Sequence, residues 1–465
     1  MFNSFKISKF LLYLVPLMVV LVTSQTLFPF IVGKYVYFRI LVDLAFIFFL
    51  LGLLFNQQES VQIGVNQRFK QLIKNPLVIA VSAFIFFFLL ACLFGFDPQY
   101  SFWSNFERGE GGLQLLHFYV FFALLALLFR EEKDWQKIFT MTIVGGLGMA
   151  FYGLLAGWGA EGFIGPKFGD PDFRFYGSIG NPAYVAAYAI FMLFYSAYLL
   201  ISKYKDKLLS FGAIVLWLLM VVFLVVFFAA ATRGAFVGLI AAVLAFISYL
   251  AFSSKRWRKW LISGAAILIL LVVLSIQFKN VPLIKSSPVF SRILDISFTT
   301  KTFEDRMTIW KMAFDGWKER PILGWGPENF IQVFDRDFNI KYFKPAEGFG
   351  AWFDRAHSIY LDYLVETGIL GLLSYLGIFI VFYWQLLWSS RINTDKEQIY
   401  TDKKSVSISQ NPYKSVLVKG LLFAIPIAYL VQGIVLFDVS PIYLNLFLLF
   451  GFAVYKFTNN HSLKV

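Results

Sequence analysis

The sequence contains few charged residues, a single cysteine and three histidines. Only 15% of its 465 residues are Asp, Glu, Lys or Arg, far fewer than the surface of a soluble protein of this length needs. The one cysteine, Cys92, lies inside an apolar run, which excludes an internal disulfide and a metal site built from thiolates. The three histidines, His117, His357 and His461, are too few for a histidine-rich metal site.

Hydrophobic residues, in contrast, are abundant. They make up 59% of the chain, aromatic residues make up 20%, and the mean hydropathy is +0.69. This composition is typical of a polytopic membrane protein, whose aromatic side chains face lipid and the membrane interfaces. The net charge of +13 comes from basic residues in short loops between apolar runs, which argues against a nucleic-acid partner.

Twelve apolar runs are close to the roughly 20 residues that a helix needs to cross a bilayer, which predicts an all-α membrane fold of about 12 spans. Lys6 and Lys9 precede the first run as in a signal peptide, but no A-x-A-like cleavage site follows, so we interpret this run as a retained span. The runs cover approximately 11–32, 36–55, 77–96, 113–129, 138–157, 182–201, 211–230, 235–252, 261–277, 368–388, 416–437 and 441–457.

Basic residues are distributed unequally between the two sides of the membrane. An even number of spans places both termini on one side, where 23 Lys and Arg residues fall, against six in the short loops opposite. The positive-inside rule therefore predicts cytoplasmic termini. The chain divides into nine spans over 1–277, a large external loop over 278–367 and three spans over 368–465, the last part with a flexible cytoplasmic connector at 389–415.

The external loop is the only segment polar enough to form a chemical site. Its apolar spacing predicts an amphipathic helix over 306–317, and Trp310 and Trp317 suit a helix at the membrane interface. Arg306 is expected at the start of this helix, where a cation opposes the helix dipole unless an anion is bound nearby. A helix that only covers the bundle remains the alternative.

His357 is the one histidine predicted on the external side. Ser358 is a plausible N-cap of a helix that continues into the tenth span after Gly368, so His357 would stand at a helix entrance beside Arg355. A neutral imidazole can accept a proton from a hydroxyl group. A purely structural histidine is the alternative.

Arg233 occupies a tight turn between the seventh and eighth spans, at the outer membrane boundary. It has no acidic neighbour in the sequence, and such a position is costly unless an anionic group meets the guanidinium. Snorkelling to the interface is the alternative. Arg108, Arg174 and Arg355 are weaker external candidates of the same kind.

Two pairs of aspartates have a spacing that a divalent cation could use. They are Asp170/Asp172 and Asp335/Asp337, but the spacing is common by chance and Arg336 lies within the second pair. We therefore predict no metal and no other cofactor. Several external arginines with one histidine fit instead a membrane-embedded anionic substrate, such as a lipid diphosphate, since guanidinium groups match phosphate oxygens.

An ordered set of short motifs across about residues 100–380 resembles the O-antigen ligase and polymerase family of bacterial glycan transferases. The motifs are Phe106-Glu-Arg-Gly, Gly180-Asn-Pro-Ala-Tyr-Val-Ala-Ala-Tyr, Thr232-Arg-Gly-Ala, Arg306-x3-Trp310, Pro321-Ile-Leu-Gly-Trp-Gly-Pro-Glu-Asn-Phe330, His357-Ser-Ile-Tyr-Leu-Asp and Glu366-Thr-Gly-Ile-Leu-Gly. Each motif alone is weak, but their order is specific.

The resemblance implies a GT-C-like fold and a metal-independent, inverting transfer of a glycan from undecaprenyl diphosphate at the outer face of the inner membrane. It implies that Arg233 and Arg306 bind the diphosphate and that His357 is the base that activates the acceptor hydroxyl. Arg355, Arg108 and Arg174 match less securely and are expected to bind the diphosphate or the glycan.

The acceptor stays open. It could be a lipid A–core sugar, a protein Ser or Thr, or the end of another glycan, in which case the chain would be a polymerase. A flippase for lipid-linked glycans is the alternative from another class, but it would carry charges along its spans rather than in an external loop. The expected partners are thus the lipid-linked donor, the acceptor and the bilayer.

Overall fold

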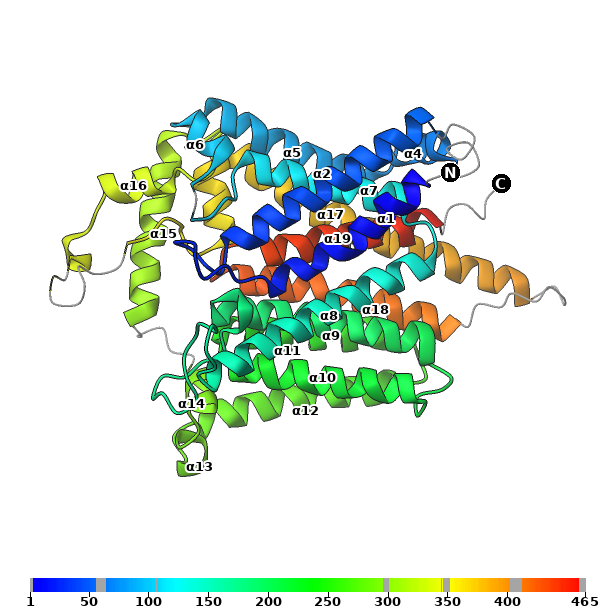
Figure 1. The fold of residues 1–465 in the computed structure, drawn as a ribbon. Coiled ribbons are helices and arrows are strands. Elements are labelled where there is room, and N and C mark those ends of the chain that lie inside the picture. Colours follow the sequence, from blue (N-terminus) through cyan, green and yellow to red (C-terminus); the bar gives the residue numbers. More distant parts are fainter. Residues whose placement is uncertain are drawn as a thin grey trace.

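The computed structural model describes residues 3–55, 64–105, 107–295, 301–343, 345, 352–401 and 412–459, and within them it contains helices and no strands. The helices run side by side in one bundle (Figure 1). This confirms the predicted all-α polytopic membrane fold. Before the external segment the helices are α1 (Ser4–Leu14), α2 (Val32–Phe55), α4 (Val65–Leu72), α5 (Pro76–Phe94), α6 (Pro98–Trp103), α7 (Gly112–Leu128), α8 (Glu132–Gly157), α9 (Pro182–Tyr204), α10 (Phe211–Ala229), α11 (Arg233–Ser253) and α12 (Arg258–Gln277).

The second part of the chain contains the external helices and three further long ones. The short 3-10 helices of the described chain are η1 (Val15–Val20), η2 (Gly177–Ile179) and η3 (Ile340–Tyr342). The remaining α-helices are α13 (Pro282–Lys285), α14 (Pro288–Leu294), α15 (Lys301–Glu319), α16 (Phe330–Arg336), α17 (Ile359–Thr401), α18 (Pro412–Gly433) and α19 (Ser440–Asn459).

Ten helices in the described part of the chain are long and apolar enough to cross a membrane, and they correspond to ten of the twelve expected runs. The other two runs look different. Helix α7 is apolar but has only 17 residues, and the first run, expected over 11–32, is divided between α1 and η1. Pro16 stands at the start of η1, where it removes one donor from the α-helical ladder and favours the change to 3-10 geometry.

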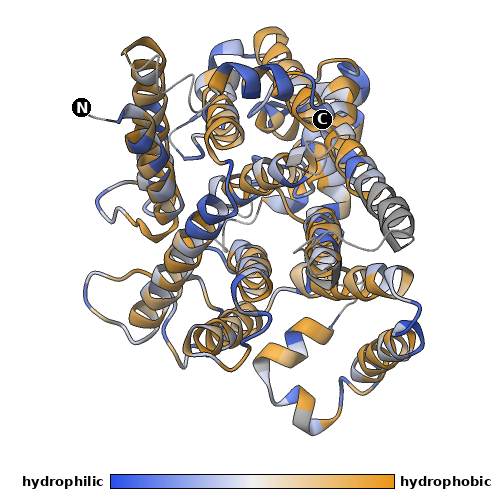
Figure 2. Ribbon diagram, turned by 90° about the vertical axis from the view of Figure 1, so that its right-hand side faces the viewer, coloured by the Kyte–Doolittle hydropathy of each residue, from blue (hydrophilic) through white to orange (hydrophobic). Residues whose placement is uncertain are grey.

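The two ends of the bundle differ. The start of α1 and the end of α19 lie at one end, and α6, α15 and α16 lie at the opposite end (Figure 1). Hydrophobic residues cover the spanning helices along their lengths (Figure 2). Helices α9 and α19 are central, with 78% and 83% of their spanning windows buried, whereas α12 has none of its window buried and lies at the periphery.

A break in α17 fixes the connection between α15 and α16. Gly368 has φ +66° inside the helix, a left-handed conformation that glycine adopts without steric cost. The break frees backbone groups of α17, so that Trp325 N donates to Val365 O at 2.8 Å, Gly326 N to Glu366 O at 2.8 Å and Ile369 N to Pro321 O at 2.9 Å. The external segment after α15 is thereby attached to the membrane bundle.

Two boundaries differ from those expected. Helix α15 begins at Lys301, so Arg306 lies in its second turn and not at its start, and the argument from the helix dipole does not hold. The segment 389–415 is not wholly a connector, because α17 continues to Thr401 and α18 begins at Pro412. In contrast, α17 begins at Ile359, directly after the expected cap Ser358.

Candidate active site

The tight turn between α10 and α11 presents Arg233 as the first residue of α11. The turn requires φ +45° at Ala231, a strained conformation for a residue other than glycine. Arg174 stabilises this turn, since its Nε donates to Ala230 O at 3.1 Å and its Nη2 to Thr232 Oγ1 at 2.9 Å. Arg174 therefore holds the turn that positions Arg233.

Arg233 belongs to a group of cations with a single acidic partner among the described residues. Its Nε donates to the backbone oxygen of Arg292 at 2.9 Å, and its Nη2 lies 3.2 Å from Asp295. The same carboxylate also pairs with Lys279, at 3.2 Å. Burial, together with the nearby charges of Arg292 and Arg233, lowers the pKa of Arg174 to about 10. We call Arg174, Arg233, Arg292 and Arg306 the arginine cluster.

Arg306 is the member of the arginine cluster without a partner. It is half-buried on α15, and no hydrogen bond or ion pair joins its guanidinium to any residue that the structure describes. Burial lowers its pKa from the usual value, and so does the positive charge of Arg233. Two segments that are distant in the sequence, α11 and α15, thus bring two positive charges close together. This is unfavourable unless an anion binds near them.

His357 lies beside Arg306 at the entrance to α17. Its φ is +57°, a second strained position, and its ring packs between Phe353 and Phe437, with centroids at 5.4 and 5.1 Å. Nδ1 lies 3.0 Å from the backbone oxygen of Arg355, so a proton on Nδ1 leaves the Nε2 lone pair free to act as a base.

The electrostatics of the site keep this imidazole neutral. Burial lowers the pKa of His357 from its usual 6.5, and the positive charges of Arg306 and Arg108 lower it further, against an opposing contribution from Asp354 and the Arg355 backbone. A neutral imidazole at pH 7 is the form that can accept a proton.

Arg355 is held by two buried carboxylates. Its Nη2 pairs with Glu328, and its Nη1 lies 2.9 Å from both oxygens of Glu366. Burial alone would lower the pKa of Arg355, but the charges of Glu328 and Glu366 raise it well above the usual value. In this arrangement Arg355 anchors the segment that carries His357, and its donors are not directed at the arginine cluster.

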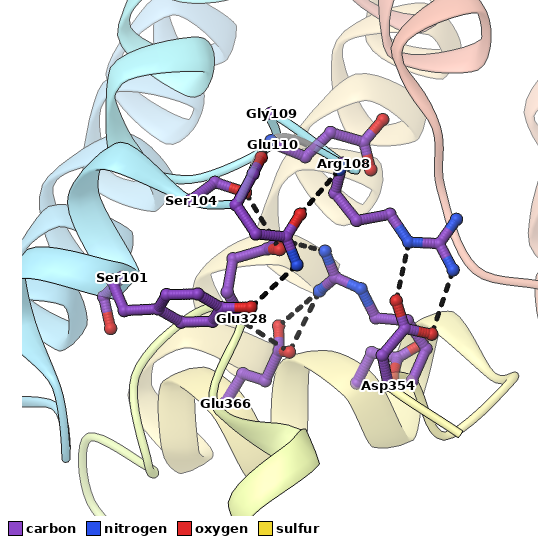
Figure 3. Close-up of polar contacts among 12 residues, drawn as sticks. Ser101, Ser104, Arg108, Gly109, Glu110, Glu328, Asp354 and Glu366 are labelled. Carbon is purple, nitrogen blue, oxygen red and sulfur yellow. Dashed lines mark hydrogen bonds and ion pairs between the residues drawn. The ribbon is translucent and has the colours of Figure 1, made fainter. Parts of the chain in front are cut away.

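Arg108 also has a carboxylate partner, because it forms a bidentate ion pair with Asp354. Nε and Nη2 lie 2.7 and 2.9 Å from the two carboxylate oxygens, as Figure 3 shows. Burial disfavours the charged form of Arg108, but the hydrogen bonds that it donates to Asp354 and the charge of that carboxylate raise its pKa above the usual value. The guanidinium also lies 5.1 Å from the ring centroid of Phe437, so Arg108 and His357 contact the same ring.

The structure thus brings Arg306 near Arg233 and near His357, whereas Arg174 and Arg355 are occupied in holding the segments around them. The sequence motifs alone predict no role for Glu328, Glu366 or the other acidic residues near the site. Their positions in the sequence could have predicted buried ion pairs, because an acidic residue inside or beside an apolar run is costly without a partner. The buried ones near the site are Glu110, Glu328, Asp362, Glu366 and Asp438, and Asp354 is partly buried.

No group of three or more His, Cys, Asp or Glu side chains in the described chain is arranged to hold a metal ion. The two aspartate pairs have other contacts. Asp337 pairs with Arg336 at 2.9 Å, and Asp170 accepts from the backbone of Lys167 at 2.8 Å.

The fold and the site together define a polytopic helical membrane protein with an arginine cluster and a neutral histidine at one end of its bundle. Residues 218–376 match the model of a family described as O-antigen ligase. The resemblance to this family is therefore confirmed for the part of the chain that contains Arg233, Arg306 and His357, and the family consists of membrane enzymes that act on glycans. No curated protein matches the chain.

Proposed function

We propose that this chain is a glycosyltransferase that moves a glycan from undecaprenyl diphosphate to an acceptor hydroxyl group. The reaction takes place at the outer face of a bacterial inner membrane, with both termini in the cytoplasm. The acceptor is a lipid A–core sugar or a similar group, as in O-antigen ligases.

The observation that carries the proposal is the unpartnered guanidinium of Arg306, whose charge acts with that of Arg233 and also on His357. A diphosphate placed there would supply the missing negative charge. It would also place the anomeric carbon near a neutral base that can deprotonate the attacking hydroxyl group. Arginine suits this task because its planar donors bind phosphate oxygens in pairs and stay charged.

The reaction follows from this placement. The acceptor oxygen attacks the anomeric carbon of the glycan, and its proton passes to Nε2 of His357. The bond between the anomeric carbon and the phosphate oxygen breaks, and the lipid diphosphate leaves with the bonding electron pair, so the configuration inverts. Arg233 and Arg306 stabilise the charge that develops on the leaving group, a preorganised contribution that is usually large.

The proposal is tested by reconstituting the protein in lipid vesicles with an undecaprenyl-diphosphate-linked glycan and candidate acceptors, followed by mass analysis of the product. We expect a glycan–acceptor product in the presence of EDTA, and none from Arg306→Ala. Arg320→Ala is the matched control, since Arg320 follows the same helix but lies over Trp325, at 4.9 Å. Unchanged transfer by Arg306→Ala, or inhibition by EDTA that Mg²⁺ reverses, would contradict the proposal.

A further inference from the structure

A cavity of about 200 Å³ is lined by residues at or just before the starts of α2, α7, α9 and α19. It is distinct from the arginine cluster, whose members are absent from its wall. The ring of Phe437 connects the two places. It contacts His357 at 5.1 Å, the Arg108 guanidinium at 5.1 Å and the ring of Tyr184 at 5.6 Å, and Arg108 and Tyr184 both line the cavity.

The cations around this cavity, unlike Arg306 of the arginine cluster, already have acceptors for their donors. Arg108 is neutralised by Asp354. The three donors of Lys34 are used by backbone oxygens of Leu21, Phe30 and Ser178, at 2.6 to 2.7 Å. Burial raises the pKa of Glu110 to about 7. The cavity therefore suits a neutral ligand and not a second anion.

Polar groups on the wall are free for such a ligand. The Tyr184 hydroxyl makes no hydrogen bond with any described residue, and the Asn181 side chain uses only Oδ1, which accepts from Ala183 N at 2.9 Å. Ile179, Val439 and Pro441 supply apolar wall. The volume is below the roughly 300–1,000 Å³ of sites for drug-sized ligands, so it admits one ring rather than an oligosaccharide.

We infer that this cavity is the acceptor subsite and that the acceptor is a neutral sugar, whose hydroxyl groups bond Tyr184 and Asn181 while its apolar face packs against the aliphatic wall. The inference rests on the proposed function. The Phe437 ring supports it, because this one ring contacts His357 and also contacts Arg108 and Tyr184 of the cavity wall. A sugar in the cavity would thus lie close to the Phe437 ring, against which the base packs.

The test uses the full chain in vesicles with the lipid-linked donor, and either methyl glycosides of neutral hexoses and heptoses or a Ser/Thr peptide as the acceptor probe. Tyr184→Phe removes one hydroxyl, and Asn181→Ser removes the amide donor but keeps an N-cap oxygen. We expect each to raise the acceptor KM about three- to tenfold, the effect of one hydrogen bond, with the donor KM unchanged. Tyr188→Phe, on the same helix but bonded to Thr142 inside the bundle, is the matched control and should change neither KM.

Transfer to the peptide but to no glycoside would overturn the inference and leave the proposed function intact. So would an unchanged acceptor KM in Tyr184→Phe, or a parallel rise in the donor KM, which would assign the cavity to the donor. If the wild-type chain consumes no lipid-linked donor with any acceptor, the proposed function fails and the inference fails with it.

Discussion

The residues of the site fall into two groups with different physical roles. Arg108 and Arg355 are paired with buried carboxylates and fix the position of the backbone around His357. Arg306 has no such partner among the described residues and is free to meet a ligand. Both groups are arginines in external segments, so the sequence alone could not separate them. The separation depends on carboxylates that come from distant segments.

The neutral state of His357 predicts a particular pH dependence. Because burial and nearby positive charges lower its pKa below 6.5, the imidazole remains an active base as the pH falls from neutral to 6.5. Transfer should be lost only at lower pH, as Nε2 becomes protonated. A pH profile of kcat/KM with the reconstituted protein checks this. Half-loss of activity above pH 6.5 would contradict it, and His357→Ala should cost about 10²–10⁴-fold in kcat at every pH.

The paired state of Arg355 predicts a loss of stability. Arg355→Ala leaves Glu328 and Glu366 buried without their counter-charge, a change that typically costs about 3–5 kcal/mol. Thermal unfolding of the solubilised protein measures this. Arg336→Ala is the control, because Arg336 is exposed and its ion pairs should contribute only about 0–1 kcal/mol. Equal stabilities of the two variants would show that the buried pair does not hold the loop.

At the scale of elements, the site is built where helices begin, end or break. Arg233 opens α11, His357 precedes α17, and the break at Gly368 attaches the segment after α15. Apolar periodicity and capping residues in the sequence predict the start of α17 and the turn before α11. They do not predict the start of α15 at Lys301 or the division of the first run. Those depend on local packing and on the effect of Pro16.

The break in α17 predicts that Gly368 tolerates no side chain. A Cβ at this position would lie 2.2 Å from Ile322 O, and the left-handed backbone alone costs about 1–2 kcal/mol for an alanine. Gly368→Ala should therefore lower both the unfolding temperature and the rate of transfer. Gly377→Ala is the matched control. It lies on the same helix with no atom within 4 Å of its Cβ position, and a helical alanine should be neutral or stabilising by about 0.5–1 kcal/mol. Equal effects of the two changes would contradict the role of the break.

At the scale of the whole molecule, hydropathy and charge predict more of the architecture than the short motifs do. Ten of the expected spans are long apolar helices, and the ends of the chain that the structure describes lie together, opposite α15 and α16 (Figure 1). The site itself could be predicted only in part. Arg233, Arg306 and His357 follow from their external positions, but the cavity beside them is made by residues of at least four segments. Its existence depends on how the helices pack.

The orientation of the molecule in the membrane is the remaining prediction at this scale. The excess of basic residues in the loops at the end with the termini predicts that this end is cytoplasmic, and the proposed chemistry requires α15 outside. A fluorescent protein fused to the C-terminus should fluoresce, since it folds in the cytoplasm. Alkaline phosphatase fused after Ile340, in an exposed part of the external segment, should be active, since it folds only outside. An inactive phosphatase at Ile340 with an active one at the C-terminus would show that the topology is the reverse of the one predicted. His357 and the arginine cluster would then lie in the cytoplasm, and transfer at the outer face would have no basis.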